Sequence, residues 1–417
     1  MLDIYTMILA GGRGERLLPL TQHRAKPAVP FGGKYRIIDV TLSNCLNSGL
    51  RKIAVLIQYK SHSLDRHIRR GWSIFNPELG EFIFSIPPQQ RISAEWYRGT
   101  ADAVHQNLFL LEQERPKFLL VLAGDHLYKM NYADMLRFMQ ETEADAVVGA
   151  LEWPVEEARQ FGVLGVDASN RVIRFEEKPA NPFHLPDDPT HAFISMGIYL
   201  FRTDHLYEEL RKDSEMATAH DFGKNIIPNM ILNNKKVFAY NFEDENKKQV
   251  KYWRDIGTLD AYYEANMDLV GVDPHLNLYD QAWPIRTYQG QFPPAKFVFA
   301  DDFEGGLRGM ALDSIVSGGC IISGSLVQNC VLSPNVRIEH HAEVHDSVIM
   351  ENVKIGEGSR IRRAIIDKGV VIPPETIIGH NPEYDRQRFP LTEEGVAVVT
   401  PDSPIKKTSP HGTGTCQ

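Results

Sequence analysis

Two hydrophobic periods divide the chain. From the N-terminus to about residue 265, short continuous apolar runs alternate with stretches of helical spacing, and such runs are typical of strands buried on both faces. The apolar runs are 53–57, 118–123 and 146–150, and the helical stretches are 101–113 and 132–141. This alternation predicts an α/β fold with an open, mostly parallel, Rossmann-like sheet, in which ligands bind at the carboxyl ends of the strands.

The last quarter of the chain has a different period. Between residues 321 and 378 an aliphatic residue recurs at spacings of six, six and five, so that Ile321, Ile338 and Ile355 are one full repeat apart. No helical period gives this pattern. It is the hexapeptide-type pattern of a parallel β-helix, which places one aliphatic side chain per short strand in a triangular core. Such coils usually wind left-handed, an exception to the right-handed crossover rule, so we predict a left-handed β-helix.

The two periodic regions are separated by a segment that has neither period. Residues 268–300 combine prolines with aromatic residues such as Trp283 and Phe292, and so much aromatic surface indicates an ordered connector. After Thr400 the composition predicts a mobile tail. The expected domains are an α/β domain at 1–267, the connector at 268–300, a β-helix at 301–400 and the tail at 401–417.

Composition excludes several classes of protein. A length of 417 residues favours two domains, and 43% hydrophobic with 24% charged residues is ordinary for a globular chain. A net charge of −9 argues against a general nucleic-acid binder. Four scattered cysteines fit a reducing compartment without structural zinc, and no run has transmembrane length or the pattern of a signal peptide. We therefore expect a cytoplasmic protein with neither nucleic-acid nor membrane partners.

A glycine-rich loop follows the first apolar run. It comprises Gly11, Gly12, Arg13, Gly14 and Arg16, and Lys26 comes shortly after it. Glycines bring backbone N–H groups close to a ligand, and N–H groups beside Arg and Lys suit several phosphate oxygens. The loop is not a P-loop, and Leu17 replaces the third glycine of a dinucleotide fingerprint. The segment predicts a triphosphate or pyrophosphate site, and a turn with solvated arginines is the alternative.

Seven short segments carry a family resemblance. They are 9–17, 24–33, 96–103, 122–126, 175–179, 195–199 and 253–258. Together they resemble bacterial glucose-1-phosphate adenylyltransferases (ADP-glucose pyrophosphorylases), over nearly the whole chain and including the β-helix. The first segment alone would indicate only a sugar nucleotidyltransferase, whereas 24–33 and 96–103 narrow the resemblance to the ADP-glucose branch.

The resemblance implies that 1–267 is a nucleotidyltransferase catalytic domain that makes ADP-glucose and pyrophosphate from ATP and glucose 1-phosphate, for glycogen or α-glucan synthesis. The sugar phosphate is already an anionic nucleophile, so catalysis requires alignment and charge neutralisation rather than a general base. The loop glycines, Arg13, Arg16 and Lys26 would hold the triphosphate, with Arg16 on the departing pyrophosphate. Asp125 and Asp255 would hold Mg²⁺, which prefers such hard oxygen ligands. A turn or helix-cap role is the alternative for each aspartate alone.

The resemblance also assigns the substrate contacts. Lys178 would bind the phosphate of glucose 1-phosphate and Glu177 the sugar hydroxyls. The remaining sugar-phosphate positions are Tyr97, Gly162 and Ser195, and the last two have an alternative interpretation as turn residues. Gly99 joins the ATP and pyrophosphate site. Gln89 and Gln90 are candidates for pairing with the adenine edge, with a solvated loop as the equal alternative.

Members of the resembling family bind anionic metabolites as effectors, and they assemble as homotetramers. The candidate effector-binding residues here are His23, Arg24, Arg36, Arg362, Arg363, Arg386 and Arg388. Each of these alone is also an ordinary surface charge. His23 stands where some sugar-phosphate-activated relatives carry lysine, and histidine is mostly neutral at pH 7, which argues against activation by fructose 1,6-bisphosphate specifically. The faces and exposed end of a β-helix suit oligomerisation.

Three other functions share features with this sequence. A catalytically silent regulatory subunit would lack the phosphate loop or the metal carboxylates, yet this chain has Arg16, Lys26, Asp125, Lys178 and Asp255. An enzyme that uses UTP, GTP or dTTP would keep the same chemistry. A fused acetyltransferase would use a β-helix histidine, for which His340, His341 and His345 are candidates. The β-helix is short and lacks a long looped insertion, so we expect these histidines at exposed corners.

Overall fold

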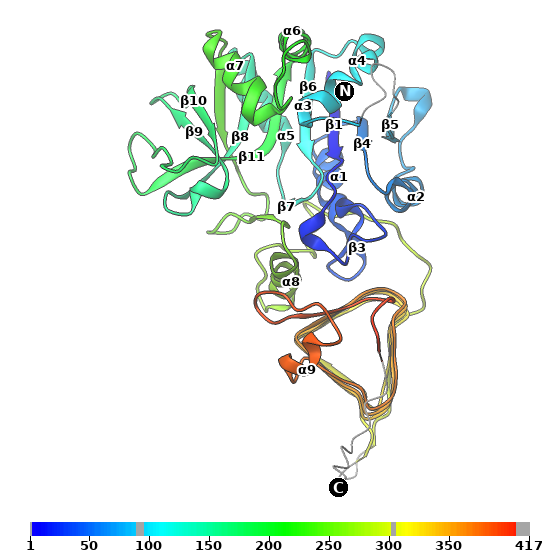
Figure 1. Cartoon of the computed structure of the whole chain (residues 1–417). Coiled ribbons are helices and arrows are strands. Elements are labelled where there is room, and N and C mark those ends of the chain that lie inside the picture. The colour runs from blue at the N-terminus through cyan, green and yellow to red at the C-terminus, as the bar shows by residue number, and fades with distance from the viewer. Residues whose placement is uncertain (1, 89–95, 302–305, 406–417) are drawn as a thin grey trace. The chain divides into compact units, whose positions relative to one another are not determined.

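The computed structural model describes residues 2–88, 96–301 and 306–405 (Figure 1). Tertiary contacts divide the chain into two compact units whose segments interleave along the sequence. The first unit consists of Met1–Arg13, Ile38–Trp253 and Gln281–Ile285, and the second of Gly14–Ile37, Arg254–Asp280 and Arg286–Gln417. The glycine-rich loop is therefore divided between the units after Arg13.

The first unit is built on a nine-stranded sheet with order β10-β9-β11-β6-β1-β4-β5, to which β8 and β12 are added. Its parallel core is formed by β6 (Phe118–Ala123), β1 (Ile4–Ala10), β4 (Lys52–Ile57) and β5 (Phe82–Ile86). Residues on both faces of β1 are buried, among them Tyr5, Met7 and Ile8. The continuous apolar runs thus form strands covered on both faces, as the sequence predicts.

Antiparallel strands extend this core on one side. They are β11 (His191–Arg202), β8 (Ala146–Pro154), β9 (Gly162–Val166) and β10 (Val172–Glu177), and β12 (Val237–Asn241) pairs in parallel with β8. The long strand β11 pairs with β6, β8 and β9, and its register with β8 shifts between Ser195 and Tyr199. The sheet is consequently mixed, with its parallel part centred on β1.

Helices accompany the strands of the first unit (Figure 1). They are α1 (Ile37–Asn47), α2 (Ser61–Gly71), α3 (Thr100–His105), α4 (Leu108–Glu114), α5 (Tyr132–Glu141), α6 (Thr203–Ser214) and α7 (Ile227–Leu232). The helical stretch expected at 101–113 is split into α3 and α4. At the break, the Asn107 Nδ2 donates to the Ala103 carbonyl at 2.8 Å, a side-chain bond that competes with continued helix.

The second unit contains a left-handed parallel β-helix of triangular section (Figure 1). Its first sheet is β14 (Lys296–Val298), β17 (Ile321–Ser323), β20 (Arg337–Ile338), β23 (Lys354–Ile355) and β26 (Val371–Ile372). The second is β15 (Met310–Leu312), β18 (Leu326–Gln328), β21 (Glu343–His345), β24 (Arg360–Arg362) and β27 (Ile377–Ile378). The third is β16 (Ile315–Val316), β19 (Val331–Leu332), β22 (Val348–Ile349), β25 (Ala364–Ile366) and β28 (Ala397–Val399).

The predicted register is wrong at one position. Ile338 and Ile355 are fully buried and stack on Ile322, not on Ile321, which is only partly buried. The corner between β17 and β18 is one residue shorter than the corners of later coils, and Gly324 turns there at φ 54°. Because inward and outward positions alternate along a strand, this shorter corner moves the inward position by one residue.

Short elements complete the described structure. They are β2 (Pro30–Phe31), β3 (Tyr35–Arg36), β7 (His126–Tyr128), β13 (Trp253–Asp255), α8 (Leu259–Met267) and α9 (Pro382–Arg386). None of the helices in the described ranges has both the length and the apolar character needed to cross a membrane.

Candidate active site

The carboxyl ends of three parallel strands bring predicted site residues together in the first unit. In the sheet register Leu9 pairs with Ala123 and Ala10 with Ile57. The Gly124 N–H donates to the Leu9 carbonyl at 3.0 Å, and a Cβ on Gly11 would lie 3.2 Å from the Gln58 Cβ. The start of the glycine loop therefore lies between Gln58 and the segment that leads to Asp125, at the edge where open α/β sheets bind ligands.

Arg13 is anchored to aromatic side chains. Its Nε donates to the Tyr59 hydroxyl at 2.8 Å, and its guanidinium carbon lies 5.2 Å from the centroid of the same ring. The Tyr59 ring in turn stacks on Trp96, with centroids 5.4 Å apart and planes 4° apart. These contacts connect the glycine loop with the start of the predicted segment 96–103.

Tyr97 and Gly99 lie in a tightly packed segment. The Tyr97 carbonyl accepts a hydrogen bond from Gln58 Nε2 at 3.2 Å, and its hydroxyl accepts one from Asn107 Nδ2 at 3.1 Å. Burial raises the pKa of the Tyr97 hydroxyl, which therefore stays protonated at neutral pH. A Cβ on Gly99 would collide with the carbonyl oxygens of Ala219 and His220, so the close backbone approach requires glycine.

Gly162 and Glu177 face each other across β9 and β10. They are register partners, and a Cβ on Gly162 would lie 2.6 Å from the Phe175 ring and 2.9 Å from Glu177 Oε2. Burial raises the pKa of Glu177, and the neighbouring charge of Asp221 adds to this, whereas Lys178 and Lys224 oppose it. The absence of a side chain at Gly162 thus lets the Phe175 ring and the Glu177 carboxylate pack directly against the β9 backbone.

The register shift in β11 carries Ser195 to the same region. The Ser195 Oγ accepts a hydrogen bond from the Gly197 N–H at 3.3 Å and lies 3.4 Å from the Tyr199 hydroxyl. Burial raises the pKa of Tyr199, and the charges of Asp221 and Glu177 add to this. Tyr199 therefore has Ser195, Glu177 and Asp221 as neighbours.

Two of these residues are missing from the sequence-based site. Tyr199 belongs to the segment 195–199 that carries the family resemblance, and its spacing from Ser195 could have indicated it. Asp221 lies in a stretch with neither a hydrophobic period nor a recognised motif, so only the fold brings it to Glu177. Lys178 is exposed, has a left-handed backbone at φ 51°, and donates its N–H to the Phe161 carbonyl at 3.0 Å.

Asp125 lies next to this region. A Cβ on Gly197 would lie 3.6 Å from the ring of His126 and from the Cβ of Ala123, the residues that flank Gly124 and Asp125. The His126 Nε2 is 3.7 Å from Asp125 Oδ1, and the His126 ring packs edge-on against Trp253. The Asp125 side chain is 29% exposed and so is accessible to a ligand.

In the second unit, cations gather around Asp255. The Nζ of the buried Lys26 lies 3.1 Å from Asp255 Oδ1. A Cβ on Gly257 would lie 3.3 Å from Arg16 Nη2 and 3.2 Å from Asp255 Oδ2. Gly14 turns at φ 63°, and a Cβ there would lie 3.2 Å from the Lys26 Cβ. Arg16, Lys26 and Asp255, predicted from separate segments, therefore converge within this unit.

Each unit has a carboxylate of the kind that divalent cations prefer. Asp125 in the first unit and Asp255 in the second offer carboxylate oxygens, the ligands that hard divalent metals prefer. Both side chains are about a third exposed, which leaves an oxygen of each accessible to a metal.

The predicted effector-binding residues have varied surroundings. Arg24 forms a buried bidentate ion pair with Asp367, with N–O distances of 2.8 and 2.9 Å. Arg36 donates to the Ala28 carbonyl. Burial lowers the pKa of Lys368, and the charges of Arg24 and Arg36 add to this. Lys368, which the sequence interpretation missed, thus lies in the same positive field.

The other candidates lie elsewhere in the second unit. His23 Nε2 is 3.4 Å from Asp402 Oδ2, with both side chains exposed, and Arg362 Nε is 3.3 Å from Asp346 Oδ2. The Arg363 guanidinium donates to the Glu394 carbonyl at 3.1 Å. Arg386 is exposed at the end of α9.

Arg388 is largely enclosed by neighbouring side chains. It pairs with Asp385 at 2.6 Å, and its guanidinium stacks 4.0 Å from the centroid of the Tyr384 ring.

Gln89 and Gln90, the candidates for adenine recognition, lie outside the described residues.

Comparison with known proteins covers both units. A nucleotidyl transferase family model matches residues 5–271, and a GlmU-like C-terminal hexapeptide model matches 293–399. The glucose-1-phosphate adenylyltransferase of Rhodopirellula baltica is 57% identical over 402 residues, which is 96% of this chain and 90% of the relative. Those of Methylococcus capsulatus and Koribacter versatilis are 55% and 54% identical over 95% and 96% of this chain, and 93% and 96% of their own lengths. The chain is a nucleotidyltransferase and belongs to the glucose-1-phosphate adenylyltransferase family.

Proposed function

We propose that this enzyme transfers the adenylyl group of ATP to α-D-glucose 1-phosphate, giving ADP-glucose and pyrophosphate for glycogen or α-glucan synthesis. The observation that carries the proposal is identity above one half over nearly the full length of relatives named for this activity. The predicted chemical groups support it, because Arg16, Lys26, Asp125, Lys178 and Asp255 are all present.

The triphosphate half of the reaction falls to the glycine loop and its cations. We assign Gly11, Gly12, Gly14 and Gly99 to close backbone approach, and Arg13, Arg16 and Lys26 to the phosphate oxygens. A phosphate oxygen of the sugar phosphate attacks the α-phosphorus of ATP, and the bond from that phosphorus to the pyrophosphate oxygen breaks. Arg16 neutralises the charge that develops on the leaving pyrophosphate.

The sugar-phosphate half uses the pocket beside Gly162. Lys178 pairs with the substrate phosphate, and Glu177 accepts hydrogen bonds from sugar hydroxyls. Tyr97 and Ser195 complete the contacts assigned from the resemblance, and we add Tyr199 and Asp221 because both lie with Glu177. A substrate held at both ends is aligned for in-line attack without a general base.

The metal ligands proposed are Asp125 and Asp255, with Mg²⁺ as the ion. When bound, the ion neutralises phosphate charge and orients the α-phosphate. Lys26 orients the Asp255 carboxylate through its 3.1 Å contact.

Regulation and assembly follow the family pattern in this proposal. Anionic metabolites act as effectors through the cations around Arg24 and Arg36, to which Lys368 is added, and His23, Arg362, Arg363, Arg386 and Arg388 remain candidates. The chain assembles as a homotetramer with residues 301–400 as its regulatory and oligomerisation domain. The buried free thiols of Cys45, Cys320 and Cys330 favour a reducing cytoplasmic location.

The test is pyrophosphate release from purified protein with Mg²⁺, glucose 1-phosphate and, in turn, ATP, UTP, GTP and dTTP. Asp125→Asn removes a proposed metal ligand, and Asp204→Asn is the matched control, because Asp204 is 79% exposed in the first turn of α6. Turnover that favours ATP, is lost in the first variant and persists in the second supports the proposal. Preference for another nucleotide overturns the choice of ATP, and no turnover with any nucleotide indicates a silent regulatory subunit.

A further inference from the structure

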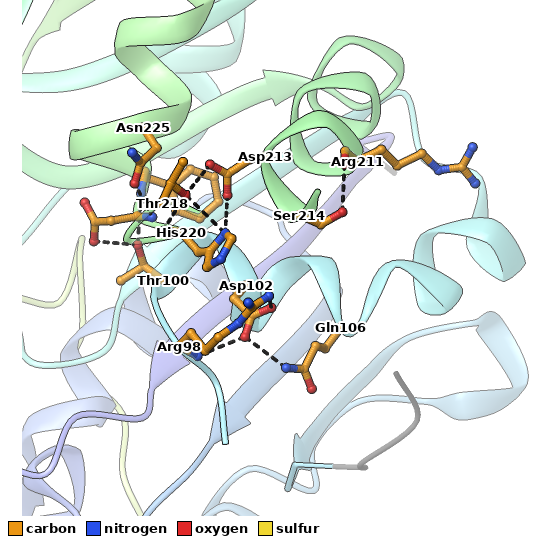
Figure 2. A network of polar contacts seen from close by, with 12 residues as sticks. Arg98, Thr100, Asp102, Gln106, Arg211, Asp213, Ser214, Thr218, His220 and Asn225 are labelled. Carbon is orange, nitrogen blue, oxygen red and sulfur yellow. Dashed lines mark hydrogen bonds and ion pairs between the residues drawn. The ribbon is translucent and has the colours of Figure 1, made fainter. Parts of the chain in front are cut away.

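A buried acid–histidine pair lies beside the segment that contains Tyr97 and Gly99. Asp213, near the end of α6, and His220 are each only 3% exposed, and Asp213 Oδ2 is 2.7 Å from His220 Nδ1 (Figure 2). The Thr218 hydroxyl donates to Asp213 Oδ1 at 2.7 Å and accepts the His220 N–H at 3.0 Å. The imidazole and the backbone of His220 are therefore both fixed to the same carboxylate.

The backbone of His220 supports the segment that contains Tyr97 and Gly99. Its carbonyl accepts the N–H groups of Ala101 at 2.8 Å and Asp102 at 3.3 Å. Gly99 packs so closely on the same carbonyl that no Cβ fits. His220 itself has φ 49°, a left-handed conformation that a non-glycine residue adopts only when its surroundings hold it there.

The residue after His220 is connected to the same segment. Asp221 Oδ2 accepts the Thr100 hydroxyl at 2.9 Å, and the Thr100 Oγ1 accepts the Phe222 N–H at 3.0 Å. Asp221 Oδ1 accepts the N–H groups of Gly223 and Lys224, both at 3.0 Å. One short turn thus fixes Asp221 and Lys224, both of which act electrostatically on Glu177.

A second buried carboxylate holds the other side of the segment. Asp102 is 4% exposed, and its Oδ2 accepts the Arg98 N–H and the Gln106 Nε2, both at 2.9 Å (Figure 2). The backbone on both sides of Gly99 is therefore fixed, by Asp102 within the segment and by His220 from outside it. Only the support from His220 depends on α6, because His220 pairs with Asp213 of that helix.

We propose that Asp213 and His220 are positioning residues for the sugar-phosphate half of the reaction. Neither lies among the residues assigned to substrate contact. Through the turn 218–221 they set the position of the segment with Tyr97 and Gly99 and that of Asp221. A buried acid–base pair adds little net stability compared with apolar packing, so its specific contribution is this orientation. The inference rests on the proposed function, because it names residues that organise the same site.

Two variants and one control test the inference. His220→Asn keeps a residue that tolerates the left-handed backbone but removes the imidazole, and Thr218→Val is a milder change that removes only the hydroxyl link. The control is His67→Asn in α2. His67 forms an equally buried pair with Asp39, with Nε2 and Oδ1 2.6 Å apart. His67 and Trp72, which both contact this carboxylate, belong to none of the site segments.

The kinetic readout is the Michaelis constant of each substrate. A displacement of about 1 Å in a positioning group can lower the reaction rate by up to about 100-fold. We therefore expect the smaller displacement in His220→Asn to raise the KM for glucose 1-phosphate about tenfold. We expect Thr218→Val to raise it less and the KM for ATP to change little in either variant. The thermal midpoints of His220→Asn and His67→Asn are measured alongside, to compare variants of similar destabilisation.

Hydrogen exchange provides a readout that requires no catalysis. The amides of residues 100–104 should exchange faster in His220→Asn than in the wild type and be unchanged in His67→Asn, because only His220 accepts the Ala101 and Asp102 N–H groups. The inference is overturned if exchange at residues 100–104 is unchanged in His220→Asn. It is also overturned if His220→Asn changes the KM values for glucose 1-phosphate and ATP no differently from His67→Asn. A wild-type protein without turnover contradicts the proposed function instead, and the exchange result still tests the positioning.

Discussion

At the scale of single residues, glycines and partly buried carboxylates shape the proposed substrate site. Gly162 lets Phe175 and Glu177 pack against its backbone, and Gly99 allows its segment to approach the carbonyl of His220. Glu177 remains partly buried next to Asp221, a placement that disfavours its charged form. The glycines and the partly buried Glu177 carboxylate both lower stability, and we therefore expect them to serve substrate binding.

Gly162→Ala should impair the enzyme. The new Cβ would lie 2.6 Å from the Phe175 ring and 2.9 Å from Glu177 Oε2, so one of them must move. We expect a loss of about 1–3 kcal/mol in the free energy of unfolding, as for other overpacked sites, and a higher KM for glucose 1-phosphate. Urea unfolding and steady-state kinetics measure the two effects. Gly271→Ala is the control, because its Cβ would meet nothing closer than 3.5 Å, and similar behaviour of both variants would contradict the argument.

Glu177→Gln should separate stability from activity. Burial raises the Glu177 pKa above its ordinary value of 4.5, so the charged form destabilises the fold at neutral pH, and this effect vanishes as the pH falls below that value. We therefore expect the variant to have a higher thermal midpoint than the wild type at pH 7, with a smaller difference near pH 4. The variant should also bind glucose 1-phosphate more weakly at pH 7. A lower midpoint at pH 7 would refute the assigned cause of the pKa shift.

At the scale of elements, the β-helix follows from its repeat because each inward aliphatic residue stacks on its counterpart in the next coil. Val327, Val344 and Ile361 form one such column, fully buried. The split between α3 and α4 and the shorter corner at Gly324 depart from the regular pattern for local reasons. Between α3 and α4, the Asn107 side chain competes for the Ala103 carbonyl. At Gly324, the corner contains one residue fewer than the corners of later coils.

The corrected register makes a direct prediction. Ile322→Ala removes a fully buried side chain and should lower the free energy of unfolding by about 2–5 kcal/mol. Ile321→Ala, one position earlier and only partly buried, should cost clearly less. Urea unfolding followed by circular dichroism compares the two. Equal losses of stability, or a larger loss in Ile321→Ala, would contradict the corrected register and support Ile321 as the inward residue of the first coil.

At the scale of the whole molecule, the chain is assembled from segments far apart in sequence. Residues 14–37 group with the β-helix, and the ion pair between Arg24 and Asp367 joins positions at opposite ends of the second unit's sequence. Both side chains are almost completely buried, so the pair is protected from salt.

Breaking this ion pair should destabilise the protein strongly. Arg24→Met and Asp367→Leu each leave one buried charge without its partner, which typically costs about 3–5 kcal/mol, whereas the double variant should recover most of that loss. A double-mutant cycle of unfolding free energies in low and high salt provides the measurement. Additive losses would show that the two residues act independently.

The sequence predicts those parts of the structure that depend on local pattern. Continuous apolar runs indicate the strands of the parallel core, and the repeat indicates the β-helix. It does not predict the antiparallel placement of β11 or the grouping of residues 14–37 with the second unit, because long-range contacts decide both. The candidate site divides in the same way. Lys26 and Asp255 were expected from their motifs, whereas Asp221 and Lys368 come to their places only through the fold.

The interleaved order of the two units has a consequence for synthesis. Residues 14–37 leave the ribosome long before Asp367, the partner of Arg24, which follows Arg24 by 343 positions. Arg24 must therefore remain without this partner while most of the polypeptide is made, and a chain that stalls before the last coils cannot bury it. Completion of the second unit must thus wait for its last coils, and a chain that lacks them exposes the basic segment 14–37 to chaperones and proteases.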